Sequence, residues 1–247
     1  MKTKFGRKLD NVARQQALLV ALSDDLALPL IQIKSAQELI ASADFSKPVS
    51  RSQSVGITAS AEAGLKMIEA YRLLLTSQEI LNMSFDPVAV GAILDDVAHQ
   101  LVPFASQYAT KIEVDVQGRL TPVLVHQPSL SVALQTLSAS LIRAQVAQQP
   151  VSQHRLVLGA HRYNESLVAA GVFSEVKGLS GTSLRAAHSL VGKARQPLPV
   201  VPPGTAGGIL IADMLCTSLW QPLRHSAHRS LGGLVTTLPT SKQMQFV

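Results

Sequence analysis

Cysteine is almost absent from this chain. Its 247 residues include one cysteine, Cys216, which excludes a disulfide framework and every zinc or iron–sulfur site built from several thiolates. This cysteine content is typical of proteins from a reducing compartment. Cys216 lies in an apolar segment, residues 209–219, so we expect it to be a small core residue.

Aromatic and charged residues are also scarce. Phe, Tyr and Trp make up 4% of the chain, and Asp, Glu, Lys and Arg make up 15%. The formal net charge is +6, but the one dense basic cluster lies at residues 2–8. Because few aromatic rings are available to stack on bases, we do not expect a nucleic-acid partner.

Long hydrophobic runs are missing as well. The longest stretch without Asp, Glu, Lys or Arg, residues 120–142, carries Pro, His, Gln and several hydroxyl side chains, which is too polar for a membrane span. The basic N-terminus is followed by polar residues, from Asp10 to Gln16, where a signal peptide would have its apolar segment. We therefore expect a cytoplasmic protein with no membrane partner.

What the chain does have is helical periodicity in its first third. Apolar residues make up 47% of the sequence, enough for a buried core. In residues 9–42 and again in 55–83 they recur at helical spacing, and a polar stretch joins the two segments. Two such helices form a hairpin that cannot bury both of its apolar faces alone. We predict a dimerisation domain at residues 1–84, which forms a four-helix bundle with a second copy.

Residues 85–247 are expected to form a second domain in which helices and strands mix. Asp86 is predicted to cap a helix whose first turn holds Pro87. Polar and apolar residues alternate over 111–116, which predicts a half-buried strand. Further strands are predicted at 122–125, 155–160, 167–173 and 231–238, and further helices at 129–147 and 207–219.

The segments between these elements are rich in Gly, Ser and Pro and are expected to be loops. The fold class that this order predicts is α+β: the N-terminal two-helix hairpin is followed by an α/β sandwich, with helices on one face of a mixed sheet.

This two-part plan resembles the cytoplasmic core of a sensor histidine kinase, in which a dimerising hairpin precedes an ATPase domain of the Bergerat or GHKL type. The resemblance extends from about residue 9 to residue 240. Residues 23–30 read Ser-Asp-Asp-Leu-Ala-Leu-Pro-Leu and are similar to the family's Ser-His-Glu-Leu-Arg-Thr-Pro-Leu. Asp24 stands at the phosphoacceptor histidine, Asp25 at the adjacent orienting acid, and Leu28 at the residue that positions water for phosphatase chemistry. A carboxylate is a poor substitute for a nucleophilic imidazole.

The helix at 129–147 is similar to the family's Asn-rich box, whose side chains hold magnesium and phosphate. The resemblance places Thr136 and Ser140 at the two ligand positions and Arg143 at the basic position. Hydroxyls are weak magnesium ligands. Arg143 is interpreted either as a phosphate contact or as a solvated charge on the helix surface.

Two glycine-containing segments complete the resemblance. Ser174 stands where the family has the Asp that binds the adenine amino group, and Val176 replaces a glycine, while Gly178 is retained. At the start of the helix at 207–219, Gly207 and Gly208 are similar to a phosphate-binding turn. The closing segment 232–239 resembles the last strand of the family. The candidate nucleotide-binding residues are Ser140, Arg143, Ser174, Gly178, Gly207 and Gly208.

Other chemistry finds little support in the sequence. His225 and His228 are three residues apart, but no carboxylate lies beside them, and they are expected in a loop, so we predict no metal site. Residues 180–183 lack the Gly-x-Ser-x-Gly pattern of a hydrolase. Asp95 and Asp96 adjoin each other, point apart on a helix and are expected at the surface.

The interpretation that we favour is a catalytically inactive histidine-kinase-like scaffold, a pseudokinase of a two-component system. It is expected to form a homodimer and to bind a response regulator or another histidine kinase. ATP and magnesium are not the expected cofactors, although the small residues at the glycine turns leave room for them. Two alternatives stay open. One is a divergent ATP-binding kinase that phosphorylates an unconventional acceptor such as Asp24, and the other is a phosphotransfer adaptor, which would need a histidine that residues 9–83 lack.

Overall fold

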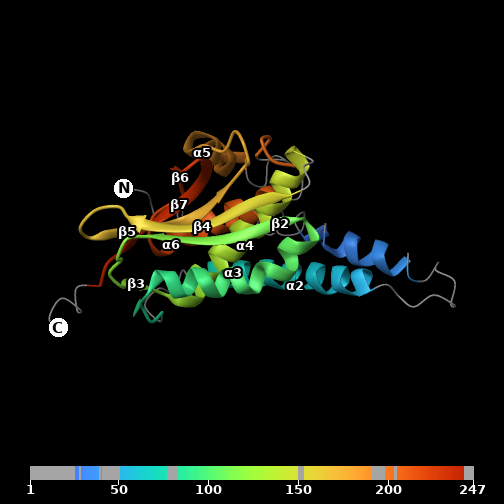
Figure 1. The fold of residues 1–247 in the computed structure, drawn as a ribbon, viewed down its shortest axis with the longest axis horizontal. Helices are drawn as coiled ribbons and strands as arrows, with labels where there is room; N and C mark the ends of the chain where they lie inside the picture. Colours follow the sequence, from blue (N-terminus) through green and yellow to red (C-terminus); the bar gives the residue numbers. More distant parts are fainter. Residues whose placement is uncertain are drawn as a thin grey trace, which may run out of the picture.

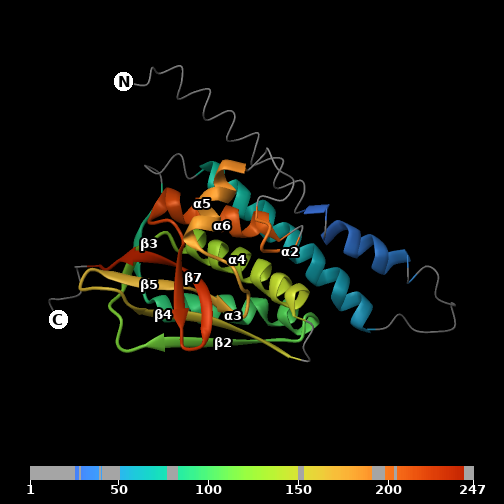
Figure 2. The ribbon, with the colours of Figure 1, turned by 90° about the horizontal axis from the view of Figure 1, so that it is seen from above.

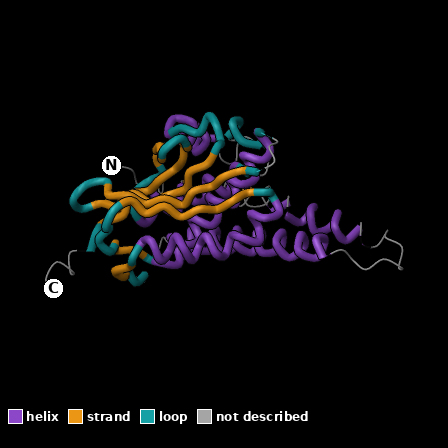
Figure 3. Tube along the Cα trace, viewed as in Figure 1, coloured by secondary structure: helices purple, strands orange, loops and turns teal. Residues whose placement is uncertain are grey.

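The fold is seen in a computed structural model that describes residues 26–27, 29–38, 40, 51–76, 83–149, 153–190, 198–202 and 205–241. Helices lie on one side of a mixed sheet (Figures 1 and 3), and the short helix at residues 181–190 lies beside the last helix and buries Leu184 and Ala187 in the same core. This arrangement confirms the predicted fold class. Asp24, Asp25 and Leu28 lie outside the described residues.

The main sheet has five strands in the order β2-β4-β5-β7-β6. The strands β2 and β4 are parallel, and all other neighbours are antiparallel. A separate pair, β1 and β3, is antiparallel. In β2, Ile112 and Val114 pack on the main core, while the alternate residues face away from it. The strands are β1 (Asp86–Val88), β2 (Thr110–Gln117), β3 (Val123–Val125), β4 (His154–Arg162), β5 (Leu167–Ser174), β6 (Arg224–His228) and β7 (Leu231–Pro239).

The helices cover the sheet in two layers. The bounds are α2 (Arg51–Thr76), α3 (Val90–Gln107), α4 (Gln127–Gln148), α5 (Gly181–Leu190) and α6 (Ala206–Leu219). The helices α4 and α6 lie next to the sheet, and α2 lies outside them. Both α4 and α6 are buried on most of their circumference, as expected for helices enclosed between two layers. Their outer side is covered by α2, which lies against both of them (Figure 2). The side chains of Ala70, Tyr71 and Leu74 on α2 join the same hydrophobic core as the sheet.

A helical segment, residues 29–38, precedes α2 and contacts it. Gly64 on α2 lies against Pro29, and the Ser60 hydroxyl donates a 3.1 Å hydrogen bond to the Gln32 side-chain oxygen. The Gln32 amide in turn donates to the Tyr108 hydroxyl at 3.2 Å. These contacts agree with the expected hairpin. The boundary at residue 84 stays a prediction, because α2 shares its core with the domain that follows.

Three local predictions were wrong. Asp86 and Pro87 do not open a helix: they form β1, paired with Val125 and Leu124, and α3 starts at Val90. A two-stranded ladder tolerates the missing N–H of a proline. His225 and His228 lie in β6 rather than in a loop, because β6 pairs with the apolar strand β7. The Gly/Ser segment after β5 includes a helix, α5.

Candidate functional site

The candidate nucleotide residues of α4 face α6 directly. The side chains of Thr136 and Ser140 are buried, and neither hydroxyl has a hydrogen-bond partner among the described residues. Gly208 on α6 lies against both. A Cβ on Gly208 would overlap the Ser140 Oγ and would lie 3.3 Å from Thr136 Cγ2. Glycine is therefore needed here for close helix packing, and the two segments expected to surround a phosphate touch each other.

Arg143 and Gly207 lie beside this contact. Arg143 is 6% exposed, which excludes the interpretation as a solvated surface charge. Gly207 is buried in the first turn of α6. The structure thus brings the α4 and α6 candidates together as a packed helix interface.

The candidates after β5 are used in local contacts. The Ser174 Oγ accepts a 3.4 Å hydrogen bond from the Val176 backbone N–H, a contact typical of a hydroxyl that stabilises a turn. Gly178 has a φ of +84°, and a Cβ there would lie 3.2 Å from Val200 Cγ1. Glycine therefore fits both the turn and the close approach of residues 198–202.

Gln148, at the end of α4, holds this turn in place, a role that the sequence does not predict. Its side-chain amide donates to the Val200 carbonyl at 2.6 Å and to the Lys177 carbonyl at 3.3 Å, and its oxygen accepts from the Lys177 N–H at 3.0 Å. Three hydrogen bonds from one amide join α4 to two loops. A glutamine at a helix end belongs to no motif, so no signal in the sequence marks this role.

The side chains at the family's magnesium and adenine positions differ in charge from those of the family. Thr136, Ser140 and Ser174 offer neutral hydroxyls where charged or strongly polar oxygens are required. Within the described ranges no group of three His, Cys, Asp or Glu residues is placed to hold a metal ion. A cavity of about 410 Å³ lies between α2, α3 and α4, and Thr136 is the one candidate ligand position that it touches.

Three histidines have carboxylate partners that sequence spacing did not reveal. His154 pairs with Glu175 at 3.3 Å, His228 with Asp115 at 2.8 Å, and His188 on α5 with Asp213 on α6. Asp115 and His228 are 113 residues apart in the chain. Such pairs arise from tertiary contact, and local pattern reasoning cannot find them.

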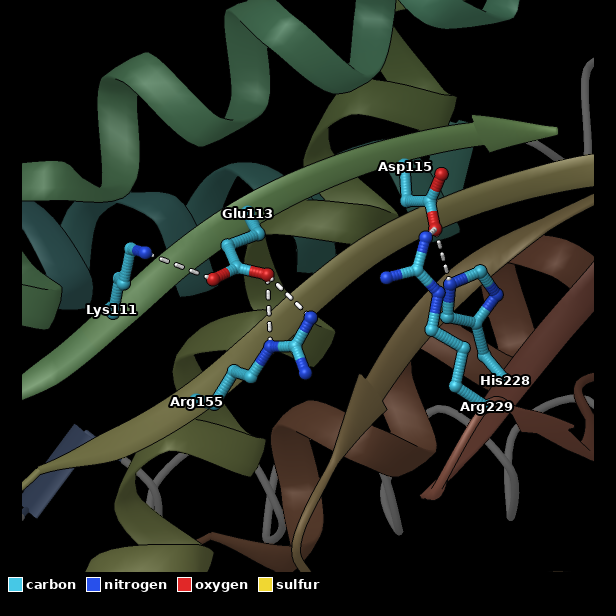
Figure 4. Close-up of polar contacts among 6 residues, drawn as sticks. All are labelled: Lys111, Glu113, Asp115, Arg155, His228 and Arg229. Atoms are coloured by element: carbon cyan, nitrogen blue, oxygen red, sulfur yellow. Dashed lines mark hydrogen bonds and ion pairs between the residues drawn. The ribbon is translucent and has the colours of Figure 1, made fainter.

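The His228–Asp115 pair lies on the face of the sheet opposite α4, where further polar side chains surround it (Figure 4). There the Asp115 carboxylate accepts hydrogen bonds from His228 Nε2 and forms an ion pair with Arg229, each at 2.8 Å. The ring of His228 is buried and lies on Phe173, with centroids 4.9 Å apart. Because Nε2 donates to Asp115, Nδ1 can accept from the Gln117 amide at 3.3 Å. Both nitrogens are thus satisfied, and His228 connects β6 to β2 across the sheet.

Glu113 forms a second charged group on the same face (Figure 4). Lys111 donates to one carboxylate oxygen at 3.1 Å, and Arg155 donates to the other through two nitrogens at 2.8 and 2.6 Å. The hydrogen bonds from Lys111 and Arg155 lower the pKa of Glu113. The side chains of Asp95 and Asp96 are exposed on α3, as predicted.

Cys216 is a buried core residue, which confirms its sequence interpretation. Burial, together with the nearby Asp213 charge, raises the pKa of the thiol to about 12. The thiol is therefore protonated at neutral pH and is not a nucleophile.

Comparison with known proteins shows which structures have a similar fold. No protein-family model and no curated protein sequence matches the chain. Full-length ShkA, solved in complex with AMPPNP, matches with a TM-score of 0.52 and 16% identity over 92% of this chain and 46% of that chain. This chain therefore spans about half the length of ShkA.

Two other histidine kinases match over nearly their whole solved length. The histidine kinase AdeS of Acinetobacter baumannii has a TM-score of 0.52 and 15% identity, over 88% of this chain and 97% of that one. The nucleotide-free catalytic domain of ThkA has a TM-score of 0.50 and 10% identity, over 64% and 97%. The chain has a core of the histidine kinase ATPase type, which confirms the resemblance at the level of the fold. No helix among the described residues has the length and apolar character to cross a membrane.

Proposed function

We propose that this chain is a histidine-kinase-like signalling protein of the cytoplasm that acts as a homodimeric scaffold and does not transfer phosphate. The observation that supports this proposal most directly is the contact of Gly208 with Ser140 and Thr136. In the resembling family, the corresponding segments surround the phosphates and the metal. Here they pack on each other, and the residues at the contact carry only hydroxyl groups, those of Thr136 and Ser140.

The loss of several polar groups together supports inactivity more strongly than any single loss. Enzymatic phosphoryl transfer depends on positioning and on charges that stabilise the transferred group. Groups that act as a unit have strongly non-additive effects, so the removal of one already abolishes most of the rate. In this chain the acceptor position is Asp24, the metal positions are Thr136 and Ser140, and the adenine position is Ser174.

The two apolar faces of the hairpin support a dimer. One face of α2, with Met67 and Leu74, is buried against the chain's own core. Leu65 and Ile68 on the same helix are 64% and 47% exposed. Leu30 and Ile31 in the preceding helical segment are 62% and 59% exposed. Large apolar side chains on both helices would be covered by a second copy in a four-helix bundle. A response regulator or another histidine kinase is the partner that we propose for this dimer.

Calorimetric titration of the full chain with a non-hydrolysable ATP analogue, with and without magnesium, tests the absence of nucleotide chemistry. We expect no binding in the micromolar range, which would correspond to about 8 kcal/mol. Micromolar binding that requires magnesium would contradict the proposal.

Incubation with labelled ATP separates the scaffold from a divergent kinase. The scaffold incorporates no label. Incorporation that Asp24→Asn abolishes, and that Asp25→Asn leaves in place, would favour a kinase with an aspartate acceptor.

Light scattering tests the dimer, because it gives the mass of the protein in solution. Twice the chain mass is expected, and the mass of one chain would contradict the dimer.

A further inference from the structure

A cavity of about 480 Å³ lies between α5, α6 and the beginning of β6, and its lining is rich in cationic and imidazole groups. The side chains of interest are Arg185, His188, Asp213, Arg224 and His225. They come from three consecutive elements of the chain, α5, α6 and β6. None of them belongs to the candidate nucleotide residues. We infer that this cavity binds the phosphate group of a small phosphorylated organic anion.

Asp213 fixes one wall of the cavity. Its carboxylate is buried on α6, and both oxygens have partners: Oδ1 accepts a 2.6 Å hydrogen bond from the Leu223 backbone N–H, and Oδ2 pairs with His188 Nε2. A carboxylate can only accept, so the proton of this pair lies on Nε2. The His188 ring is therefore held by Nε2, and Nδ1 is left as an acceptor, which suits the hydroxyl of a monoprotonated phosphate group.

Two guanidinium groups supply the positive charge. Arg185 lies one turn before His188 on α5, and Arg224 is the first residue of β6. In the part of the chain that the structure describes, neither forms an ion pair or a side-chain hydrogen bond. Arg155 and Arg229, by contrast, are paired with carboxylates on the sheet. The charge of Asp213 is already shared by His188 and the Leu223 N–H, so an anion in the cavity meets an excess of positive charge.

The chemistry of the groups favours phosphate over a carboxylate ligand. A guanidinium group donates two parallel hydrogen bonds to phosphate oxygens, and two such groups can hold a tetrahedral oxyanion from two sides. The volume lies in the range of small-molecule sites and exceeds what inorganic phosphate fills. Leu184, Pro222 and Leu223 provide apolar lining for the organic part.

Calorimetric titration of the full chain with phenyl phosphate, inorganic phosphate and benzoate tests the inference. We expect phenyl phosphate to bind more tightly than inorganic phosphate, and benzoate to bind most weakly. Tighter binding of inorganic phosphate would assign the site to the free ion instead of a phosphomonoester. If neither phosphate compound binds, or if benzoate binds as tightly as phenyl phosphate, the inference is wrong.

Variants locate the binding. Arg185→Gln and Arg224→Gln should each weaken phenyl phosphate binding roughly tenfold, as expected for a lost charge-assisted hydrogen bond, and the double variant should abolish it. Arg162→Gln is the matched control, because Arg162 is exposed at the end of β4 and does not line the cavity. Circular dichroism shows whether each variant is folded. Equal affinities in the control and in a folded double variant would overturn the assignment. The result is independent of ATP binding, so it stands or falls separately from the scaffold proposal.

Discussion

On α4, the hydroxyls of Thr136 and Ser140 are buried and have no hydrogen-bond partner among the described residues. On the outer face of the sheet, His228 is equally buried, yet it bonds to both Asp115 and Gln117. An unpaired buried hydroxyl costs stability, whereas a paired polar group offsets most of its desolvation. The α4 hydroxyls therefore reduce stability where they lie, while the polar groups of the sheet help to hold the fold.

The two regions also differ in what maintains them. The α4–α6 interface depends on shape, since a glycine allows the helices to approach closely. The sheet face depends on charges and hydrogen bonds between strands that are distant in sequence. Variants that change shape should thus affect the first region most, and variants that change polarity should affect the second.

The largest effect is expected from Gly208→Val. Its branched side chain would overlap Ser140 and crowd Thr136, and overpacking of this kind costs about 3 kcal/mol of unfolding free energy. Urea unfolding measures the loss. The companion variant Ser140→Ala removes the Oγ that Gly208 approaches, so the cost of Gly208→Val should be smaller in that background. An equal cost in both backgrounds would show that the two residues are not in contact.

His228→Ala should have the next largest effect, a loss of about 2 kcal/mol. The substitution removes the ring that packs on Phe173 and leaves the Asp115 carboxylate with Arg229 as its partner and without the His228 hydrogen bond. His225→Ala is the control, because His225 lies on the same strand with an exposed side chain and should change stability by less than about 0.5 kcal/mol. If both variants lose a similar amount of unfolding free energy, the His228 contacts do not contribute more to stability than an exposed histidine does.

Sequence patterns predicted the elements whose burial follows a regular period. The alternation at Lys111–Val116 and the apolar helix at 207–219 appear in the structure as β2 and α6, each within one residue of the predicted bounds. The elements that were missed are polar. The strand β6 reads Arg-His-Ser-Ala-His, and it is a strand only because β7 supplies its hydrogen-bond partners. Tertiary pairing overrides weak local preference in such edge strands.

For the candidate site, the resemblance selected residues, and tertiary packing decides what those residues contact. Ser140 and Gly208 were both identified from the resemblance, and the structure brings them together. That the two segments touch depends on helix packing, which no local pattern encodes. The contacts of Gln148 and the three histidine–carboxylate pairs join distant segments. Because these residue types are common at protein surfaces, no local pattern selects them.

Ser140→Ala alone should stabilise the chain by up to about 1 kcal/mol, because it removes a buried hydroxyl that lacks a partner. Ser218→Ala is a matched control: the Ser218 hydroxyl also lies on a helix but donates a 2.7 Å hydrogen bond to the Met214 carbonyl. This control should be neutral or slightly destabilising. A loss of stability in Ser140→Ala greater than in Ser218→Ala would mean that the α4 hydroxyl is paired, and the contrast between the two regions would fail.

The smallest expected effect is the pH dependence that Glu113 contributes. Its pKa is lowered in the folded chain by hydrogen bonds from Lys111 and Arg155, so the unfolded chain binds the proton more readily. The stabilisation is therefore fully present above the unfolded pKa of about 4.5 and is lost as the pH falls through the lower folded value. Because the group is partly exposed, the contribution should be under about 1 kcal/mol.

Urea unfolding between about pH 3 and about pH 7, the range over which carboxylates titrate, measures this contribution. In Glu113→Gln the free energy of unfolding should fall less steeply toward acid pH than in the unaltered chain. The double variant Lys111→Gln with Arg155→Gln keeps the carboxylate and removes its donors, so it should show the same shallower loss. A double variant as acid-sensitive as the unaltered chain would assign the effect to other carboxylates and leave this part of the sheet face without an electrostatic role.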